Sequence, residues 1–302
     1  MKNIGKLLLK IIIYTLVLIF FSIILLIILA KLDLAMQIGD FRYNELIKSG
    51  ITVDYCIYTD EEIKEDKSKK NVTLQYFPGK KDSKFVIICP GGGYLFLMGN
   101  EGSPVATKFN EEGITAFVLN YRVGLNLKNC TIYDDLARSI EFILNNSEEF
   151  NINTKDYALC GFSAGGHMIS TFASDSVNGY KKYNVKKPNY LMIGYPYFIY
   201  NKNYSDWLLK KDCTKKEAID LDILNVINSN FPKVYLFHGN KDCIAPCESN
   251  SMLMNEKLIE YKIPHKFIIF EGLNHSINIG LNSNAEGWIK EAIDFWNKEC
   301  FN

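Results

Sequence analysis

Six short apolar runs without regular polar alternation constrain the fold of this chain more than any other feature of its sequence. They cover residues 85–89, 115–120, 157–160, 190–194, 234–237 and 267–270. Such runs are typical of strands that are buried on both faces. Segments with helical spacing lie between and after them, at 104–112, 133–144, 164–173, 248–260 and 286–296. This alternation predicts the fold class α/β, with a mostly parallel central sheet and helices on both faces.

Two further regions frame this pattern. Period-two runs at 52–58 and 71–77 enclose a charged stretch at 60–70, and such patterning favours antiparallel strands at a sheet edge. A polar insertion at 198–230 carries short helical pieces, and we expect it to form a small cap. The length of the chain suffices for one large core, so residues 51–302 are predicted to form one domain.

The N-terminal segment is apolar enough to cross a membrane. Residues 11–30 are apolar apart from Tyr14, Thr15 and Ser22, and a helix of this length spans roughly 30 Å of hydrocarbon. A cleaved secretory signal would need a shorter apolar region and small residues before its cleavage site. We expect an uncleaved transmembrane helix at 11–30 and a juxtamembrane connector at 31–50, with a cleaved signal or a buried helix as alternatives.

Basic residues predict the orientation of this span. Lys2, Lys6 and Lys10 precede it, whereas Lys31 alone lies within ten residues after it. Because basic flanks tend to stay in the cytoplasm, residues 1–10 are predicted to be cytoplasmic and the domain to lie outside.

Charge and cysteine placement narrow the classes of partner. Lys plus Arg and Asp plus Glu number 34 each, so the chain offers no basic field for nucleic acid and a small neutral partner fits better. Cys89 and Cys160 end apolar runs, where a buried thiol is favoured over a disulfide. Cys243 and Cys247 lie near His238, but their spacing matches no zinc pattern. We therefore expect no metal there, and free thiols rather than a local disulfide.

The strongest local motif is Gly-Phe-Ser-Ala-Gly at 161–165, directly after an apolar run and at the start of a helical segment. In a strand-to-helix turn of this kind, the central residue is strained and the flanking glycines let the backbone pass closely. The serine hydroxyl then lies at a helix N-terminus, whose dipole favours developing negative charge. This context predicts Ser163 as a nucleophile.

A serine hydroxyl needs a base, and the chain has four histidines. His167 lies one helical turn after the serine, where packing or a local hydrogen bond is expected. His238 precedes the proposed acid, and His265 opens the last apolar run. His275 follows that run in a loop that can bring the imidazole over the strand ends, so we predict His275 as the base.

The acid is expected between the serine and the histidine, because this is the chain order in such folds. Asp242 follows the run at 234–237, and from there it can fix the tautomer of the base and stabilise the imidazolium. Glu271 is a rival acid, and a turn-capping role for Asp242 is the other interpretation. Asp220 and Asp222 belong to the insertion and have no strand before them.

A glycine-rich loop, Cys-Pro-Gly-Gly-Gly-Tyr at 89–94, follows the first buried run. Three consecutive glycines are costly in backbone entropy, and acyl transfer needs backbone N–H groups close to an oxyanion. Gly92, Gly93 and Ala164 are the predicted donors. A flexible turn is the alternative, whereas a phosphate-binding loop would need a following Lys-Ser or Lys-Thr pair.

With these motifs, residues 72–296 resemble the α/β-hydrolase esterases related to hormone-sensitive lipase and to bacterial acetyl-xylan and feruloyl-type esterases. Further matching features are Glu101-Gly102, Tyr121-Arg122 and Asn274-His275. The resemblance implies a triad of Ser163, Asp242 and His275, an oxyanion loop, and neither metal nor cofactor. Pro90 stands where many relatives have histidine, which places the chain nearer the sugar-acetyl esterases.

The leading hypothesis is a serine-dependent carboxylic ester hydrolase that deacetylates a carbohydrate or another small acyl ester near the cell envelope. One alternative is a serine peptidase of the prolyl-oligopeptidase type, although the chain leaves no room for the usual propeller domain. The other is a catalytically inactive, membrane-tethered binding protein, which would be marked by loss of a triad residue.

Overall fold

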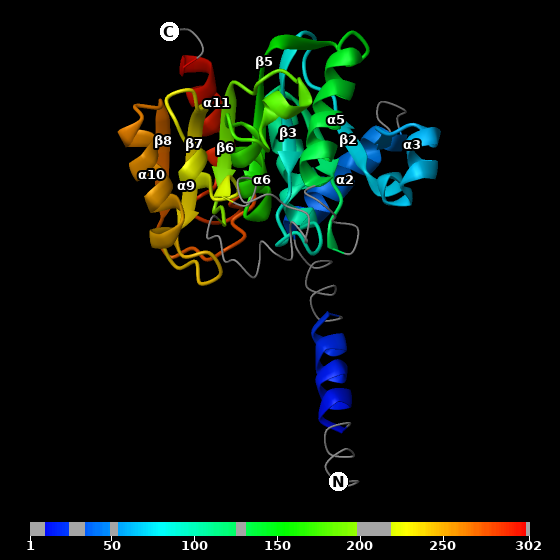
Figure 1. Ribbon diagram of the computed structural model, residues 1–302, viewed down its shortest axis with the longest axis vertical. Helices are drawn as coiled ribbons and strands as arrows, with labels where there is room; N and C mark the ends of the chain where they lie inside the picture. Colours follow the sequence, from blue (N-terminus) through cyan, green and yellow to red (C-terminus); the bar gives the residue numbers. More distant parts are fainter. Residues whose placement is uncertain (1–9, 24–33, 49–53, 125–130, 198–218, 300–302) are drawn as a thin grey trace.

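The computed structural model describes residues 10–23, 34–48, 54–124, 131–197 and 219–299. Its central sheet has eight strands in the order β1-β2-β4-β3-β5-β6-β7-β8 (Figure 1). The strands are β1 (Asp54–Cys56), β2 (Thr73–Phe77), β3 (Ser83–Cys89), β4 (Thr115–Asn120), β5 (Ile152–Phe162), β6 (Tyr190–Gly194), β7 (Lys233–Gly239) and β8 (His265–Phe270). Strands β3 to β8 are parallel, whereas β2 runs antiparallel to both β1 and β4.

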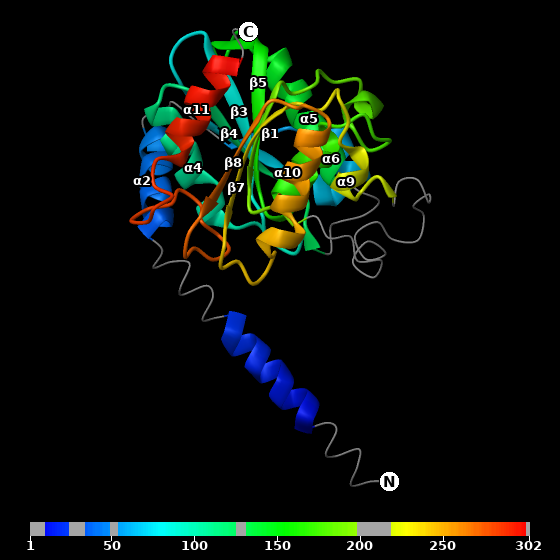
Figure 2. The same cartoon turned by 90° about the vertical axis from the view of Figure 1, so that its left-hand side faces the viewer.

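Helices cover both faces of the sheet, with α4 and α11 on one side and α5, α6, α9 and α10 on the other (Figure 2). Within the domain, the helices in the described residues are α2 (Leu34–Lys48), α3 (Asp60–Glu65), α4 (Ser103–Glu111), α5 (Thr131–Asn145), α6 (Ala164–Phe172), α9 (Ile223–Val226), α10 (Ser251–Glu260) and α11 (Trp288–Glu299). Short 3-10 helices lie at Lys67–Asn71, Gly99–Glu101, Tyr180–Tyr183 and Cys247–Ser249. The predicted α/β class, with a mostly parallel sheet between two helical layers, is confirmed.

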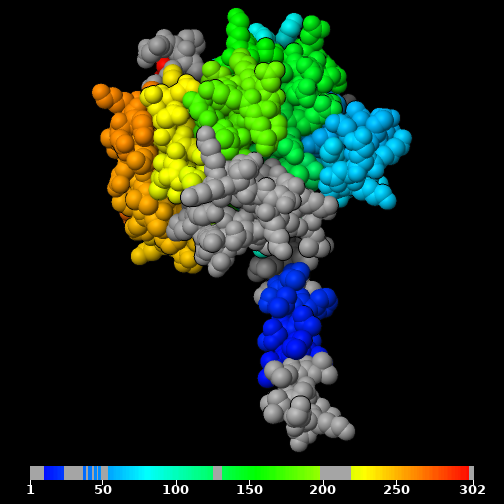
Figure 3. Space-filling model, in the orientation of Figure 1, coloured from blue at the N-terminus to red at the C-terminus, as the bar shows by residue number. Residues whose placement is uncertain are grey.

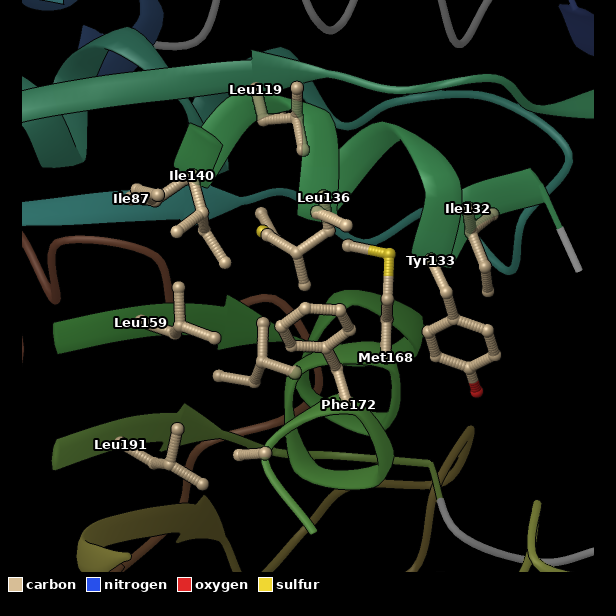
Figure 4. Packing of buried hydrophobic residues seen from close by; sticks show 14 of the residues in the cluster. Ile87, Leu119, Ile132, Tyr133, Leu136, Ile140, Leu159, Met168, Phe172 and Leu191 are labelled. Atoms are coloured by element: carbon tan, nitrogen blue, oxygen red, sulfur yellow. The ribbon is translucent and has the colours of Figure 1, made fainter. Parts of the chain in front are cut away.

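Alternate side chains of each parallel strand enter different halves of the core. On β3, Ile87 belongs to the cluster under α5 and α6, whereas Val86 and Ile88 belong to the cluster under α4 and α11. Figure 4 shows the first cluster, where Leu159 and Met168 pack between sheet and helices. Because both faces of these strands are covered, their sequences are continuously apolar. Truncating one such side chain to alanine costs about 2–5 kcal/mol of stability.

The two antiparallel strands at one end of the sheet also follow the sequence pattern. Strand β1 pairs antiparallel with β2 through Tyr55 and Leu74, and β2 pairs antiparallel with β4. The charged stretch between β1 and β2 contains α3, which is closed by a capping box of Thr59 and Glu62. Such a box satisfies two backbone donors that a helix start leaves unpaired.

Helix α2 and the first half of strand β5 were not recognised in the sequence. Residues 31–50, predicted as a connector, contain the helix α2, which packs against α4 and whose Arg42 donates to Asn110 (3.2 Å). Strand β5 begins at Ile152, well before the apolar run at 157–160, because its first half is polar and escapes a search for buried strands. Local hydrophobicity therefore placed the apolar half of the strand and missed its polar half.

A helix over residues 10–23, dark blue in Figure 1, covers part of the predicted membrane span. Its apolar side chains lie on the surface (Figure 3), and Leu18 is 68% exposed. In the part of the chain that the structure describes, no helix combines the length and apolarity needed to cross a bilayer. Residues 24–30 of the predicted span, and residues 198–218 of the predicted cap, lie outside the described residues.

Candidate active site

Ser163 occupies a strained turn between β5 and α6. Its backbone angles are φ 50° and ψ −119°, a region that non-glycine residues rarely adopt. The Ser163 N–H donates to the Gly194 carbonyl at the end of β6 (3.0 Å), which helps to hold this conformation. The turn places the serine directly before the N-terminus of α6, as the sequence motif predicts.

The glycines around the serine are required by close backbone contacts. A Cβ on Gly161 would meet the Gly165 carbonyl at 2.5 Å. A Cβ on Gly165 would overlap the Cys89 carbonyl at the end of β3. Real Cβ atoms do not approach backbone so closely, so neither position can take a larger residue without moving β3, β5 or α6.

His275 lies between Ser163 and Asp242. The Ser163 hydroxyl is 2.9 Å from Nε2 of His275, and Nδ1 of the same ring is 2.6 Å from Oδ2 of Asp242. Because the carboxylate can only accept, Nδ1 carries the proton and Nε2 is left to accept from the serine. The three side chains come from loops at the carboxyl ends of β5, β7 and β8. The structure thus brings the three predicted residues into hydrogen-bond contact.

Asp242 is buried and accepts hydrogen bonds on both oxygens. Its Oδ1 accepts from the N–H groups of Ile244 and Ala245 (2.9 Å each), and Oδ2 accepts from His275 and His238. Burial acts to raise the pKa of Asp242, but the hydrogen bonds from the two imidazoles outweigh it and hold the pKa well below its usual range. The carboxylate is therefore ionised at neutral pH, as the partner of a protonated base requires.

His238 was missed as a site residue in the sequence. Its fully buried ring donates from Nε2 to Asp242 (2.9 Å) and to the Ala245 carbonyl (2.7 Å). Its Nδ1 accepts from the Ser251 hydroxyl (2.7 Å). The sequence shows that His238 shortly precedes the acid, but no local pattern shows that the side chain turns back to the aspartate.

The predicted oxyanion donors lie together around one cavity. Gly92, Gly93 and Ala164 line it beside Ser163 and His275, and its volume is about 420 Å³. Gly92 and Gly93 have φ values of 118° and 60°, which favour glycine. The remaining walls are largely apolar and are formed by Phe96, Met98, Tyr197 and Ile244 with parts of Glu101 and Ser276.

The other histidines have partners elsewhere. His167 accepts from the Tyr94 hydroxyl (2.7 Å) and donates to the Leu221 carbonyl (2.6 Å), and burial lowers its pKa to about 4. It is therefore a neutral packing residue, as expected. His265 contacts Asn255 and the Ile263 carbonyl.

The rival acid and the cysteines have other surroundings. The exposed Glu271 accepts from Asn240, whereas the contact that the structure gives to Nδ1 of His275 is Asp242. Cys243 and Cys247 are free thiols. Within the described ranges, no group of three or more His, Cys, Asp or Glu side chains could hold a metal ion.

Known proteins are similar to this chain in sequence and in fold. The family described as BD-FAE matches residues 75–193. The chain is 28% identical to endo-1,4-beta-xylanase B of Butyrivibrio fibrisolvens over 69% of its own length, and 26% identical to an acetylxylan esterase of Xylanibacter ruminicola over 59%. These matches cover 34% and 37% of the two relatives, so the chain corresponds to about a third of each.

Solved structures share the fold over most of the chain. An acetyl ester-xyloside bifunctional hydrolase from Caldicellulosiruptor lactoaceticus superposes with a TM-score of 0.71 at 24% identity, covering 82% of this chain and 97% of that one. An esterase from Thermogutta terrifontis with bound propionate gives a TM-score of 0.68 at 18% identity, covering 82% and 94%. The chain therefore has the α/β-hydrolase fold, and the proteins it resembles are described as esterases and hydrolases.

These similarities confirm the resemblance that the motifs predicted. The region matched by the family includes the glycine loop and Ser163, whereas Asp242 and His275 lie beyond it. The assignment of these two later residues therefore rests on the sequence pattern and the geometry, and not on the family match.

Proposed function

We propose that this α/β-hydrolase cleaves small carboxylic esters with Ser163 as nucleophile, His275 as general base and Asp242 as its partner. One observation carries the proposal, the continuous contact from the Ser163 hydroxyl through His275 to Asp242 at the wall of a cavity. A carboxylate of low pKa at one ring nitrogen and a hydroxyl at the other is what proton transfer from serine needs.

In the proposed reaction, Nε2 of His275 takes the proton of Ser163 while the serine oxygen attacks the ester carbonyl carbon. The carbonyl oxygen becomes an oxyanion, which the N–H groups of Gly92, Gly93 and Ala164 stabilise. His275 then gives its proton to the leaving alcohol, and an acyl-enzyme remains. Water, activated by the same imidazole, attacks the acyl carbon and releases the acid and free Ser163.

We propose an acetylated carbohydrate, of the kind found in xylan, as the substrate class. The apolar side chains of Phe96, Met98 and Ile244 beside the serine suit a short acyl group. A similar protein is described as an acetylxylan esterase and a neighbour of the same fold as an acetyl ester-xyloside hydrolase, which supports this choice. Initial rates of the full chain on acetylated xylo-oligosaccharides and on p-nitrophenyl esters of increasing chain length test it. A preference for long acyl chains would contradict it.

The nucleophile is tested with the full chain in detergent and p-nitrophenyl acetate. Ser163→Ala should lower kcat by about 10³-fold or more, because removal of the nucleophile leaves only binding and oxyanion contacts. Ser68→Ala is the control, since Ser68 lies in the 3-10 helix Lys67–Asn71 and contacts Asp66. Wild-type activity in the Ser163 variant would overturn the assignment.

Two further assays address the alternative functions. Failure of a fluorophosphonate probe to label Ser163 would favour an inactive binding protein. Faster turnover of prolyl dipeptide substrates than of acetyl esters would favour a peptidase.

We also propose that residues 11–30 hold the chain at a membrane, with the catalytic domain outside. The support is the surface of the described helix, where Leu18 is 68% and Phe21 63% exposed. The full chain should stay in the membrane fraction after an alkaline carbonate wash, and Leu18→Arg with Phe21→Arg should release it, because each arginine costs about 2.5–3.5 kcal/mol in a bilayer. Phe41→Arg on α2 is the matched control. A wild-type chain that is washed off would contradict the anchor.

A further inference from the structure

A buried carboxylate lies against the proposed site, and the reaction steps above do not use it. Glu101 ends the 3-10 helix Gly99–Glu101, is only 1% exposed and lines the same cavity as His275. Burial raises its pKa, although its hydrogen-bond donors oppose this effect. Burying a carboxylate is costly unless its partners compensate, so the partners of Glu101 indicate its role.

One oxygen of Glu101 holds the glycine-rich loop. Its Oε2 accepts from the N–H of Gly91 at 2.7 Å. Gly91 directly precedes Gly92 and Gly93, the proposed oxyanion donors. A Cβ on Gly91 would lie within 3 Å of the side chains of Glu101 and Ser163, so loop, carboxylate and nucleophile are in close packing. The carboxylate thereby fixes the start of the segment that must point its N–H groups at the oxyanion.

The other oxygen holds the loop that carries the base. Oε1 accepts from the Tyr195 hydroxyl (2.9 Å) and from the Ser276 hydroxyl (3.4 Å), and Ser276 directly follows His275. The Tyr195 oxygen in turn accepts from the N–H of Asn278 (3.0 Å). The Tyr195 ring packs edge-to-face on the imidazole of His275, with centroids 4.9 Å apart. Two routes therefore connect Glu101 to the histidine loop.

We propose that Glu101 is a positioning residue, whose buried carboxylate ties the oxyanion loop to the His275 loop and keeps both aligned with Ser163. The inference rests on the proposed esterase function. Glu101 stays outside the proton transfers, and its effect reaches the reaction through the N–H of Gly91 and through Tyr195 and Ser276. Because an oxyanion exists only in the transition state, a loss of alignment should lower kcat and leave KM nearly unchanged.

The test compares the wild type with Glu101→Gln in the full chain. The amide keeps the shape of the side chain but removes its charge, and because an amide nitrogen can only donate, either the Gly91 contact is lost or the hydrogen bonds with the Tyr195 and Ser276 hydroxyls must reverse direction. With p-nitrophenyl acetate we expect kcat to fall about 10- to 100-fold, since small misplacements near a reacting centre have effects of this size. KM should change less than about 2-fold, because uniform binding is retained.

A second readout separates alignment from folding. The inhibition constant of an alkyl boronic acid, which mimics the tetrahedral intermediate, should rise by the same factor as kcat falls. The affinity for the product acetate should stay the same. Equal weakening of both ligands, or an unchanged kcat in a folded variant, would overturn the proposal.

Tyr195→Phe provides an independent test that leaves Glu101 in place. It removes one hydroxyl and keeps the ring against His275, so kcat should fall with KM unchanged. In the double variant with Glu101→Gln, the losses should be smaller than additive, because both changes break the same connection. If Glu101→Gln fails to fold, Tyr195→Phe decides, and a wild-type kcat in that variant overturns the proposal.

Failure of the proposed function has a different signature. A wild type that does not hydrolyse the ester and does not react with a fluorophosphonate would reject the esterase itself. A wild type that does both, together with an unaffected Glu101→Gln, would reject only the role of Glu101.

Discussion

Two buried carboxylates in this α/β-hydrolase fold, Asp135 and Glu101, have opposite kinds of partner. Asp135 on α5 is fully buried and binds the Arg122 guanidinium through both oxygens, with Nη2 at 2.6 Å from Oδ1. Glu101 is equally buried, but the hydrogen bonds that the structure gives it come from a backbone N–H and two neutral hydroxyls. One charge is neutralised within the fold, and the other lies where charges form during the proposed reaction.

The Arg122 cluster, consisting of Tyr58, Asp66, Arg122 and Asp135, connects β4, α5 and the segment after β1. Arg122 also reaches Asp66 (3.1 Å), and the Tyr58 hydroxyl donates to Asp135 (2.7 Å). The neighbouring Tyr121 donates to the Pro90 carbonyl (2.5 Å) at the start of the glycine loop. In the Tyr121-Arg122 pair, arginine thus supports the scaffold, and tyrosine supports the loop of the active site.

The largest effect is expected when the buried ion pair of Asp135 and Arg122 is broken. Asp135→Asn leaves the buried Arg122 with the partly exposed Asp66 as its anion, and the loss of a buried partner costs about 3–5 kcal/mol. The free energy of unfolding in urea should fall by this amount, while kcat per folded molecule stays within about 2-fold, because none of the cluster's atoms lines the cavity. A kcat that falls as it does in Glu101→Gln would remove the distinction between the two carboxylates.

A change in the glycine loop should instead lower kcat. At Gly92, φ is 118° and a Cβ would overlap the Phe96 carbonyl. Gly92→Ala should therefore displace an oxyanion donor, and kcat should fall about 10²- to 10³-fold. Gly287→Ala is the matched control, since φ there is also positive at 92° but a Cβ would meet no atom within 4 Å. Equal losses of kcat in both variants would point to backbone strain alone.

The smallest effect concerns the pH dependence of stability. Burial raises the pKa of Glu101 above its value in the unfolded chain, which is about 4.3. The folded state therefore holds the proton more tightly. This contribution to stability is fully present below the pKa of the unfolded chain and is lost as the pH rises through the raised pKa of the folded state.

Urea unfolding of the wild type and Glu101→Gln at pH 4, 6 and 8 measures this contribution. The stability of the wild type relative to the variant should decrease as the pH rises. Ser276→Ala keeps the carboxylate and should retain the wild-type trend. A difference that grows with pH would show that the hydrogen bonds outweigh burial.

Much of the sheet could be predicted because the inner parallel strands are buried on both faces and leave continuous apolar runs, as at Thr115–Asn120. The positions of Ser163, Asp242 and His275 followed from the same pattern, since the carboxyl ends of parallel strands meet at one edge. The sequence predicted that these three residues would meet, and the structure gives their contacts. Their catalytic roles are the proposal made above.

The residues that support the site, Glu101 and His238, could not be found from apolar runs and strand ends. Glu101 contacts Ser276, which is 175 positions later, and His238 turns back to Asp242 through a loop of unremarkable composition. Partners of this kind depend on how distant loops pack, and no spacing in the chain encodes them. Helix α2 was missed for a different reason, because its sequence mixes polar and apolar residues without a clear apolar stripe.

The contact of Gly165 with the Cys89 carbonyl has a consequence for how substrates are selected. Helix α6 rests on the end of β3 without space for even a methyl group, so the two sides of the proposed oxyanion pocket are in contact before any ligand arrives. A pocket built in advance needs little reorganisation when it binds, and a poorly fitting ligand cannot make it adapt. Discrimination among esters should then come from rejection by a rigid frame rather than from closure around the right one.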